Sequence, residues 1–463
     1  MPKLKAVHIC QDCGHTSTKW AGQCPNCKAW NTLIEEIVEE RSAALSSKNT
    51  SRPLVDFSSE IVALADVQKE ELPRTPTGIG EFDRLLGGGL VPGQVLLVAG
   101  PPGIGKSTLM LHAADKLSRE GRVLYISGEE SLGQVSGRAK RLGVAGADIY
   151  LLAETDLSKI LEAIKKHKPE FIVLDSIQTV YHPDMSGVAG SVGQVRECCA
   201  ELLRISKQTD AVLFLLGHVT KDGAVAGPKV LEHLVDTVLQ FDTEKSEMLR
   251  ILRAQKNRFG PTSEIGLFEM KEEGLCGVED ASAYFVDEVG SPAAAGKAVS
   301  VAMEGRRPIL VEVQALVTPT RYPLPRRMAT GIDVNRVLVL IAALEKHLSV
   351  RFENQDIFVS LTGGLRLRDP AIDLAVCMAM VSSARDAALA NDRVFIGEVG
   401  LLGRLGRVSH LSDRINTAAR AGFKSAVVPG RSLADLKKPV GNTGLDVSGA
   451  DDISYAVGAL KGS

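Results

Sequence analysis

Residues 95–108 read VLLVAGPPGIGKST, and this stretch decides the fold of the central part of the chain. Residues 95–99 form a short apolar run, which is typical of a strand buried on both faces of a sheet. The pattern GxxxxGKS follows, and its glycines permit a tight loop. The backbone N–H groups of such a loop point at phosphate oxygens, as does the positive end of the helix that we expect to begin at Ser107.

These residue types predict a site for ATP and Mg²⁺. Lys106 is placed to reach the β and γ phosphates, and the Ser107 hydroxyl is placed to hold Mg²⁺. A glycine-rich turn that only joins a strand to a helix is the alternative. The complete pattern and the apolar helix positions Leu109, Ala113 and Leu117 argue against that alternative. The predicted ATP-binding residues are Gly100, Pro101, Pro102, Gly103, Ile104, Gly105, Lys106, Ser107 and Thr108.

The composition is that of an ordinary globular protein. The 463 residues exceed what one hydrophobic core usually organises, so we expect two or three domains. No apolar run approaches the ~20 residues of a membrane span, and the first residues lack an apolar signal core. We therefore expect a cytoplasmic protein with no membrane partner. The net charge of −2 does not indicate nucleic-acid binding, which would need local basic patches.

The first residues carry two CxxC pairs. Each pair places two thiolates on one turn, so the two turns can close a tetrahedral Zn²⁺ site. Two disulfides are the alternative, which a reducing cytosol disfavours. So small a segment has little core, and metal binding should therefore contribute on the order of 10 kcal/mol to its folding. We expect Trp20 and Trp30, the only tryptophans, to cover the turns. The predicted zinc ligands are Cys10, Cys13, Cys24 and Cys27.

A linker and an alternating α/β segment follow this zinc module, which we place at residues 1–34. Residues 35–64 are rich in acids and serines and lack periodicity, so we expect a flexible linker. Residues 65–285 predict an α/β core whose mostly parallel central sheet is covered on both faces. Besides residues 95–99, its predicted strands include 123–127, 149–152, 171–174 and 211–216, and its predicted helices are 108–119, 132–141, 157–167 and 194–207.

Polar residues follow three of these strands, where ligands of parallel sheets gather. Asp175 ends the strand FIVLD, the usual position of the carboxylate that orients the Mg²⁺ shell. Glu129 and Glu130 follow a neighbouring strand, where one carboxylate can polarise the attacking water, and we favour Glu129. His218 and Lys221 follow a third strand, where a sensor of the γ-phosphate would lie. Each residue alone could be a cap or a solvated side chain, but together they are better explained as one site.

The motifs resemble those of a known family. GPPGIGKST, SGEES, LDSIQT, HVTKDG and KNRFG (residues 256–260), preceded by the four-cysteine module, are similar to the RadA (Sms) family of bacterial DNA repair proteins over essentially the whole chain. Several of these motifs are shared with RecA, DnaB-like helicases and KaiC-like ATPases. The resemblance implies a RecA-like P-loop ATPase that forms a homohexameric ring on single-stranded DNA. It also implies branch migration of branched DNA intermediates and a RecA-type recombinase as partner.

The KNRFG motif lies between two predicted strands, so we expect a hairpin tip that exposes Lys256 and Arg258. Such cations suit contact with DNA phosphates or insertion into a neighbouring subunit's nucleotide site, where an arginine neutralises transition-state charge. Resemblance to DnaB-type rings favours the catalytic role for both residues, with DNA coupling as the competing role. A solvated turn is the remaining alternative.

Two glycine-rich segments, residues 179–193 and 221–229, follow strand ends and are candidates for loops that line a central channel. Lys221 and Lys229 could meet phosphates, and Tyr181 could stack on a base. Surface loops without function would have the same composition, and the family resemblance favours DNA. The predicted DNA-binding residues are Lys221, Lys229, Lys256 and Arg258.

Residues 286–463 form a separate α+β domain. Its order of elements, with TGGLRLRDPAIDLAV and GEVGLLGRLGRV, resembles the catalytic domain of Lon protease. Where that protease carries its serine nucleophile, this chain reads Arg368-Asp369-Pro370-Ala371, and residues 410–413 contain no lysine to act as the base. We therefore expect a proteolytically inactive domain for oligomerisation and DNA binding.

Three functions are compatible with these features. The favoured one is a DNA-stimulated ATPase that drives branch migration in homologous recombination and DNA repair. A KaiC-like regulatory ATPase without DNA-coupled motion is the alternative. An ATP-dependent Lon-type protease is disfavoured by the missing nucleophile and base.

Overall fold

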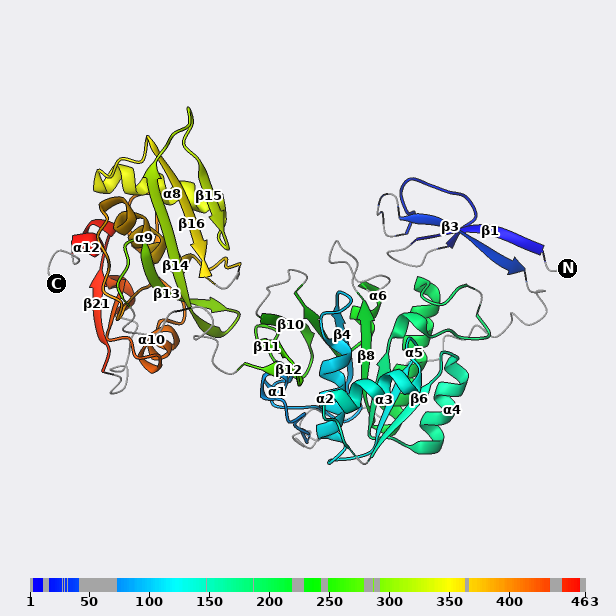
Figure 1. The fold of residues 1–463 in the computed structure, drawn as a ribbon. Coiled ribbons are helices and arrows are strands. Elements are labelled where there is room, and N and C mark those ends of the chain that lie inside the picture. The colour runs from blue at the N-terminus through cyan, green and yellow to red at the C-terminus, as the bar shows by residue number, and fades with distance from the viewer. Residues whose placement is uncertain are drawn as a thin grey trace, which may run out of the picture. The chain divides into compact units, whose positions relative to one another are not determined.

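The structure is a computed structural model (Figure 1). It describes residues 3–10, 16–26, 28, 30, 32–40, 73–146, 148–185, 187–218, 229–242, 249–278, 286, 292–362, 366–433 and 444–458. The chain divides into two compact units. One comprises Met1–Lys245 with Leu249–Val278, and the other comprises Ser246–Met248 with Glu279–Ser463.

The N-terminal module is an antiparallel sheet in the order β2-β1-β3. It is built from β1 (Lys3–Cys10), β2 (Thr16–Ser17) and β3 (Leu33–Glu40). Strand β3 runs beyond residue 35 into the segment that we expected to be linker. Strand β1 has eight residues and β3 pairs with all of them, up to Glu40 opposite Lys3, so the pairing continues past residue 35. The rest of the predicted linker, residues 41–64, lies outside the described residues.

A nine-stranded sheet forms the core of the first unit in the described part of the chain, in the order β12-β11-β10-β9-β4-β8-β7-β5-β6. Strands β4 to β9 run parallel to one another, and β10 to β12 add an antiparallel edge, which confirms the mostly parallel sheet. The strands are β4 (Val95–Gly100), β5 (Val123–Ser127), β6 (Ile149–Ala153), β7 (Phe171–Asp175), β8 (Val212–His218), β9 (Thr237–Phe241), β10 (Leu249–Asn257), β11 (Ile265–Lys271) and β12 (Gly274–Gly277).

Helices cover both faces of this sheet (Figure 1). Leu109 of α2 packs into the hydrophobic cluster on one face, whereas Ile160 of α4 and Leu202 of α5 pack into the cluster on the other face. Two of these helices have N-terminal caps formed by nearby side chains. Ser131 and Gln134 form a capping box at the start of α3. Asp156 caps α4 by accepting a hydrogen bond from the Ser158 N–H at 2.9 Å. The helices are α1 (Gly80–Leu86), α2 (Lys106–Leu117), α3 (Leu132–Arg141), α4 (Leu157–His167), α5 (Val192–Thr209) and α6 (Lys229–Leu234), with the 3-10 turn η1 (Ile177–Thr179).

Strand β4 lies at the centre of the sheet and is buried on both faces. Leu96 and Val98 belong to the cluster under α2, whereas Val95, Leu97 and Ala99 belong to the cluster under α4 and α5. Side chains of a strand alternate between faces, so a strand covered on both sides must be apolar at every position. This explains the unbroken apolar run in the sequence and fixes the position of the loop that follows it.

The second unit is built on a sheet in the order β15-β16-β14-β13-β17-β20-β21. Helix α9 packs against β13 and β14, and residues 373–382 of this helix are all buried. The main strands are β13 (Lys297–Glu304), β14 (Arg307–Pro319), β15 (Arg327–Thr330), β16 (Gln355–Leu361), β17 (Arg393–Phe395), β20 (Ser425–Pro429) and β21 (Asp446–Ala450), with the short pair β18 (Glu398–Val399) and β19 (Leu405–Gly406). The helices are α8 (Val334–Leu348), η3 (Pro370–Ile372), α9 (Asp373–Arg385), α10 (Leu411–Arg420), α11 (Gly430–Leu433) and α12 (Ile453–Gly458).

A buried ion pair, which the sequence analysis did not identify, joins the segment before η3 to α10. The Arg414 side chain is 1% exposed, and its Nη1 donates to Asp369 Oδ2 at 2.6 Å and to the Val301 carbonyl at 2.6 Å. Asp369 Oδ2 also accepts the Met303 N–H at 2.6 Å. The charges compensate each other inside the fold, so removing one partner leaves an uncompensated charge.

We predict that Arg414→Leu destabilises the second unit by about 3–5 kcal/mol, because Asp369, whose side chain is only 13% exposed, would lose its cation. The measurement is urea unfolding of the full chain, followed by a probe attached to the second unit. Arg420→Leu is the matched control, because Arg420 is exposed on the same helix and its loss should cost less than about 0.5 kcal/mol. Equal unfolding midpoints for Arg414→Leu and the unaltered protein would contradict a structural role of the pair.

Candidate ATP site and metal centre

The phosphate loop joins β4 to α2 at the carboxyl end of the parallel strands. Gly105 caps α2 with a φ of +115°, a conformation that side chains other than glycine rarely adopt. A β-carbon on Gly105 would also lie 3.0 Å from the Met270 side chain. Pro102 and Gly103 are exposed at the tip of the loop, and Ser107 lies in the first turn of α2. The free N–H groups of this first turn therefore border the exposed loop, as an anion site requires.

Lys106 is the buried cation of this loop, with only 5% of its surface exposed. Its Nζ donates to the carbonyls of Gly100 at 2.8 Å and Pro101 at 3.1 Å, and it contacts His218 Nδ1 at 3.2 Å. Burial lowers the pKa of Lys106 from 10.5 to about 8, against the opposing effect of the nearby carboxylates of Asp175 and Glu129. The lysine is thus held in place by loop carbonyls rather than by a salt bridge.

His218, at the end of β8, connects this lysine to Glu129. Its Nε2 lies 3.1 Å from Glu129 Oε1. Because an ammonium group can only donate, Nδ1 of His218 accepts from Lys106 and Nε2–H donates to Glu129. Lys106, His218 and Glu129 are therefore linked in one hydrogen-bonded chain, although they come from different parts of the sequence.

Glu129 and Glu130, which the sequence analysis did not separate fully, have different surroundings. Glu129 Oε1 accepts a hydrogen bond from the Ser176 hydroxyl. Partial burial acts to raise the pKa of Glu129, but the hydrogen bonds from Ser176 and His218, with the charge of Lys106, outweigh it and lower the pKa below its ordinary value. Glu130 instead forms an ion pair with Arg138 of α3. Glu129 is therefore the carboxylate that faces the loop lysine, and it is ionised at neutral pH.

Asp175 ends β7 beside the same loop, with 8% of its surface exposed. Its Oδ2 accepts a hydrogen bond from the Tyr125 hydroxyl at 2.8 Å. Burial, followed by the charge of Asp175, raises the pKa of Tyr125 well above its ordinary value, so the phenol stays a donor. Sequence reasoning missed Tyr125, although a tyrosine within the buried strand VLYIS was an available signal. A carboxylate oxygen of Asp175 and the Ser107 hydroxyl suit Mg²⁺. This ion usually takes one or two oxygen ligands from the protein, and water and substrate phosphates supply its other ligands.

Lys256 and Arg258 lie at the other end of the sheet. Lys256 Nζ donates to the carbonyls of Glu232 at 2.7 Å and Val235 at 2.8 Å, near the end of α6. Burial and the neighbouring Arg258 lower the pKa of Lys256. Lys256 belongs to β10, paired with β9, and is not at the hairpin tip as we expected, because these carbonyls and the strand pairing hold it. The hairpin itself is present, since β10 and β11 are antiparallel.

Asp236 anchors Arg258 to the start of β4. Its carboxylate accepts from Arg258 Nη1 at 3.3 Å, from Lys207 Nζ at 2.8 Å and from the Val95 N–H at 3.1 Å. Val95 is the first residue of β4, whereas the phosphate loop follows the last residue of this strand. Arg258 is therefore about 15–20 Å from its own phosphate loop, by the rise of an extended strand. The sequence analysis missed Asp236, although a lone acid within the apolar run LVDTVLQF was a possible signal.

The predicted DNA loops are described in part. Lys221 lies outside the described residues, and Lys229 begins α6 without a described side chain. In the other segment, Gln194 Nε2 donates to the carbonyls of Met185 at 3.1 Å and Gly187 at 3.3 Å, and its Oε1 accepts the His182 N–H at 2.7 Å. One buried side chain thus joins His182, Met185 and Gly187 by hydrogen bonds. Tyr181, next to this loop, is 37% exposed.

The N-terminal module brings together one cysteine from each CxxC pair. Cys10 and Cys24 are 0% and 1% exposed and form a small core with Leu33. Cys13 and Cys27 lie outside the described residues. Two buried thiols in one cluster, one from the end of β1 and one from the second CxxC pair, fit the thiolate site that zinc prefers. Both indoles remain exposed, while carbons of each ring lie within 4.0 Å of the position of a β-carbon on Gly22, two residues before Cys24. That Trp20 and Trp30 cover the turns therefore stays a prediction.

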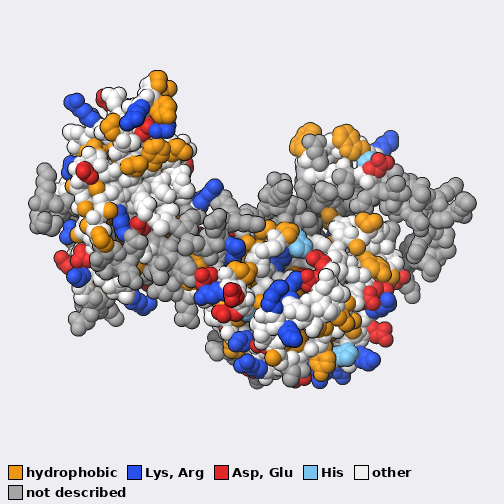
Figure 2. Space-filling view, viewed as in Figure 1, with side chains coloured by type: hydrophobic (Ala, Val, Ile, Leu, Met, Phe, Trp, Pro, Cys, Tyr) orange, Lys and Arg blue, Asp and Glu red, His pale blue; other side chains and the backbone are white. Residues whose placement is uncertain are grey.

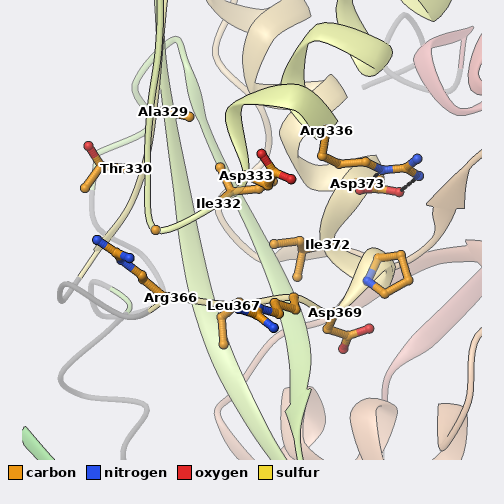
Figure 3. A pocket seen from close by; sticks show the side chains of 13 residues that line it. Ala329, Thr330, Ile332, Asp333, Arg336, Arg366, Leu367, Asp369, Ile372 and Asp373 are labelled. Atoms are coloured by element: carbon orange, nitrogen blue, oxygen red, sulfur yellow. Dashed lines mark hydrogen bonds and ion pairs between the residues drawn. The ribbon is translucent and has the colours of Figure 1, made fainter. Parts of the chain in front are cut away.

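A pocket of about 690 Å³ lies in the second unit at the position of the Lon-like motif RDPAID (Figure 3). Arg336 and Asp373 point toward each other across one side of it, and Arg336 Nε donates to Asp373 Oδ1 at 3.1 Å. Arg366 lies on its other side in Figure 3. Among the described residues, those that line the pocket include no serine, cysteine or lysine, so the lining offers no serine–lysine pair for acyl transfer.

The chain is similar to known proteins over essentially its whole length. Family models match the chain as an AAA domain at residues 77–224, a rubredoxin metal binding domain at 8–35 and subunit ChlI of Mg-chelatase at 333–432. Curated relatives named DNA repair protein RadA are 47% identical in Bacillus subtilis, covering 99% of both chains, and 47% identical in Halalkalibacterium halodurans, covering 100% of both. A solved KaiC-like protein from Pyrococcus horikoshii is 20% identical, with a TM-score of 0.38, and covers 45% of this chain and 99% of that chain.

The fold class predicted from the sequence is therefore confirmed. It comprises a mostly parallel α/β ATPase sheet, an N-terminal ribbon of a metal-binding type, and a C-terminal α+β domain of the ChlI and Lon-like kind. In the described ranges, no helix has both the length and the apolar character that crossing a bilayer would require.

We predict that Lys106→Met abolishes ATP hydrolysis and yet stabilises the nucleotide-free protein by roughly 1–3 kcal/mol at pH 7. Below pH 8 lysine is charged in both states, and burial makes the charged form unfavourable in the folded state. The gain should fade as pH rises from about 8 toward 10.5, because the folded state then loses its proton first. Urea unfolding at several pH values measures this. The exposed Lys116→Met on the same helix is the control, and an equal gain there would contradict the explanation.

We predict that Cys24→Ser removes about one zinc ion per chain and unfolds the N-terminal module, because four thiolates close the site. Metal analysis of the purified protein and protease sensitivity of the module are the measurements. Cys276→Ser, outside the module, should retain the full zinc content. Unchanged zinc in Cys24→Ser would remove Cys24 from the ligand set.

Proposed function

The chain belongs to the RadA family of DNA repair proteins, and from this premise we propose that it is an ATP-driven motor on DNA. In this proposal it binds single-stranded DNA as a homohexameric ring and promotes branch migration of branched intermediates in homologous recombination. A RecA-type recombinase is the expected partner. The zinc module predicted at residues 1–34 extends with β3 to Glu40, residues 65–285 are assigned to the ATPase core, and residues 286–463 are assigned to an inactive Lon-like domain for oligomerisation and DNA binding.

The hydrolysis site is assigned to the residues around the phosphate loop. Lys106 and residues 100–108 hold the phosphates, and Ser107 and Asp175 hold Mg²⁺, which neutralises charge on the phosphate oxygens. Glu129 polarises the attacking water, which suits a carboxylate kept ionised by Ser176 and His218. Because His218 contacts both Lys106 and Glu129, a phosphate that engages Lys106 also changes the surroundings of the carboxylate.

The position of Arg258 is the observation that carries the motor proposal. Arg258 and Lys256 lie near the first residue of β4, whereas the phosphate loop follows its last residue, so neither residue serves its own site. Arg258 is 58% exposed at its side chain and can reach a neighbouring molecule. In a ring of like subunits, such an arginine enters the next subunit's site and couples hydrolysis to the contact between subunits. Direct coupling to DNA is the competing role for both residues.

Contacts with DNA are assigned to the loops that follow strands β7 and β8. Gln194 holds His182 and Met185 by hydrogen bonds next to the exposed Tyr181, which suits a base-stacking contact. Lys221 and Lys229 supply cations for phosphates. Arg366 and Arg368 on the pocket of the second unit are exposed and provide further cations.

The proposal is tested by measuring ATP hydrolysis and three-strand branch migration with and without single-stranded DNA. We expect DNA to raise the rate of hydrolysis, and the DNA affinity to fall steeply with salt. Lys106→Ala should bind DNA without turnover or branch migration. If rings form and hydrolysis is the same with and without DNA, the motor proposal fails and a regulatory ATPase replaces it.

We predict that Arg258→Ala and Lys106→Ala proteins are each inactive and that mixing them restores hydrolysis. In a random ring with equal amounts of both, about one quarter of interfaces combine an intact loop lysine with an intact neighbouring arginine. Only these interfaces would hydrolyse ATP, so the mixture should regain about one quarter of the specific activity of the unaltered protein. A mixture of Arg258→Ala with the double variant Lys106→Ala/Arg258→Ala is the control and should stay inactive. If the first mixture is inactive although mixed rings form, Arg258 does not act on a neighbouring site.

A further inference from the structure

The N-terminal module exposes both tryptophans of the chain. Trp20 and Trp30 are 62% and 69% exposed, although indole side chains are usually buried. Each ring has carbons within 4.0 Å of the point where a β-carbon on Gly22 would lie, so the two indoles border the same glycine. Hydrophobic side chains gather on the visible face of this module in Figure 2. The proposed function gives these two rings no role.

Backbone contacts hold the two tryptophans in place. Trp30 pairs with Gln23 in an isolated antiparallel bridge, and Gln23 Nε2 donates to the Lys28 carbonyl at 2.9 Å. On the other side, the Ser17 hydroxyl donates to the Lys19 carbonyl at 2.6 Å, next to Trp20. The rings are thus presented from an ordered frame, which reduces the entropy lost when a ligand binds them.

The residues next to the rings in the sequence are polar and basic. Lys19 and Lys28 are exposed and lie one and two residues from Trp20 and Trp30. The sequence from residue 16 to residue 32 contains no aspartate or glutamate. A site for an apolar helix would need a continuous apolar groove, whereas exposed aromatic faces beside cations match bases and phosphates.

We propose that Trp20 and Trp30 form a base-stacking site for unpaired nucleotides, with Lys19 and Lys28 placed for the flanking phosphates. This inference rests on the proposed function and adds to it a contact for single-stranded DNA outside the ATPase core. Stacking on an aromatic ring is tolerant of sequence, as a motor that moves along DNA requires. Docking of a protein on the same rings is the competing occupant.

The experiment uses the intrinsic fluorescence of the full-length protein, since its two tryptophans are both in this site. Titration with an oligothymidylate should quench the fluorescence, whereas an abasic strand of equal length should leave it nearly unchanged. Trp20→Ala and Trp30→Ala should each weaken oligothymidylate affinity about tenfold in fluorescence anisotropy, which is the loss of one stacked base. Trp20→Phe and Trp30→Phe should retain most of the affinity.

Tyr455→Ala is the matched control, because this aromatic residue is also 62% exposed but lies in the second unit. Zinc content equal to that of the unaltered protein shows that each tryptophan variant keeps the folded module. Absence of quenching, equal quenching by the abasic strand, or unchanged affinity of both alanine variants overturns the inference. If hydrolysis still rises with DNA in that case, the proposed function stands alone. Quenching without any DNA effect on hydrolysis would instead support the stacking site and overturn the motor.

Discussion

Compensation of the buried Lys106 ammonium group is the interaction on which the ATP site depends. A cation with 5% exposure needs partners, and the loop carbonyls of Gly100 and Pro101 provide them at 2.8 and 3.1 Å. His218 then links the same ammonium group to Glu129. Because groups in one hydrogen-bonded network respond together, a phosphate at the loop and a water near the carboxylate are physically connected. The chemistry assigned to the site follows from this connection.

Different functional residues lie at the two ends of strand β4. Its apolar residues alternate between two hydrophobic clusters, so the strand is held firmly from both faces. The phosphate loop leaves its carboxyl end, and Asp236 ties Arg258 to its amino end. A subunit that binds nucleotide at one end and offers an arginine at the other is suited to a ring. This arrangement supports the proposed action of Arg258 on a neighbouring subunit.

The second unit uses its charges in a different way. Asp369 and Arg414 form a buried pair, and Asp373 is held by Arg336 beside the pocket. In both cases the partner of the carboxylate is an arginine, which does not lose its proton at physiological pH and cannot act as the base for a nucleophile. At the Lon-like position, Asp369 and Asp373 are thus each paired with an arginine of the same unit. This agrees with the role in assembly and DNA binding that we propose for this domain.

Local patterns in the sequence determined the phosphate loop, the positions of Lys106 and Asp175 at element ends, and the alternation that builds a parallel sheet. These features depend on residues close together in the chain, so spacing and periodicity reveal them. Only the tertiary structure separated Glu129 from Glu130, placed Tyr125 on Asp175 and Asp236 on Arg258, and paired Arg414 with Asp369. It also showed that Trp20 and Trp30 are exposed. The pairings depend on which strands and helices become neighbours, and the exposure of the tryptophans depends on the small core of the N-terminal module. The spacing of nearby residues in the sequence reveals neither the neighbours nor the size of the core.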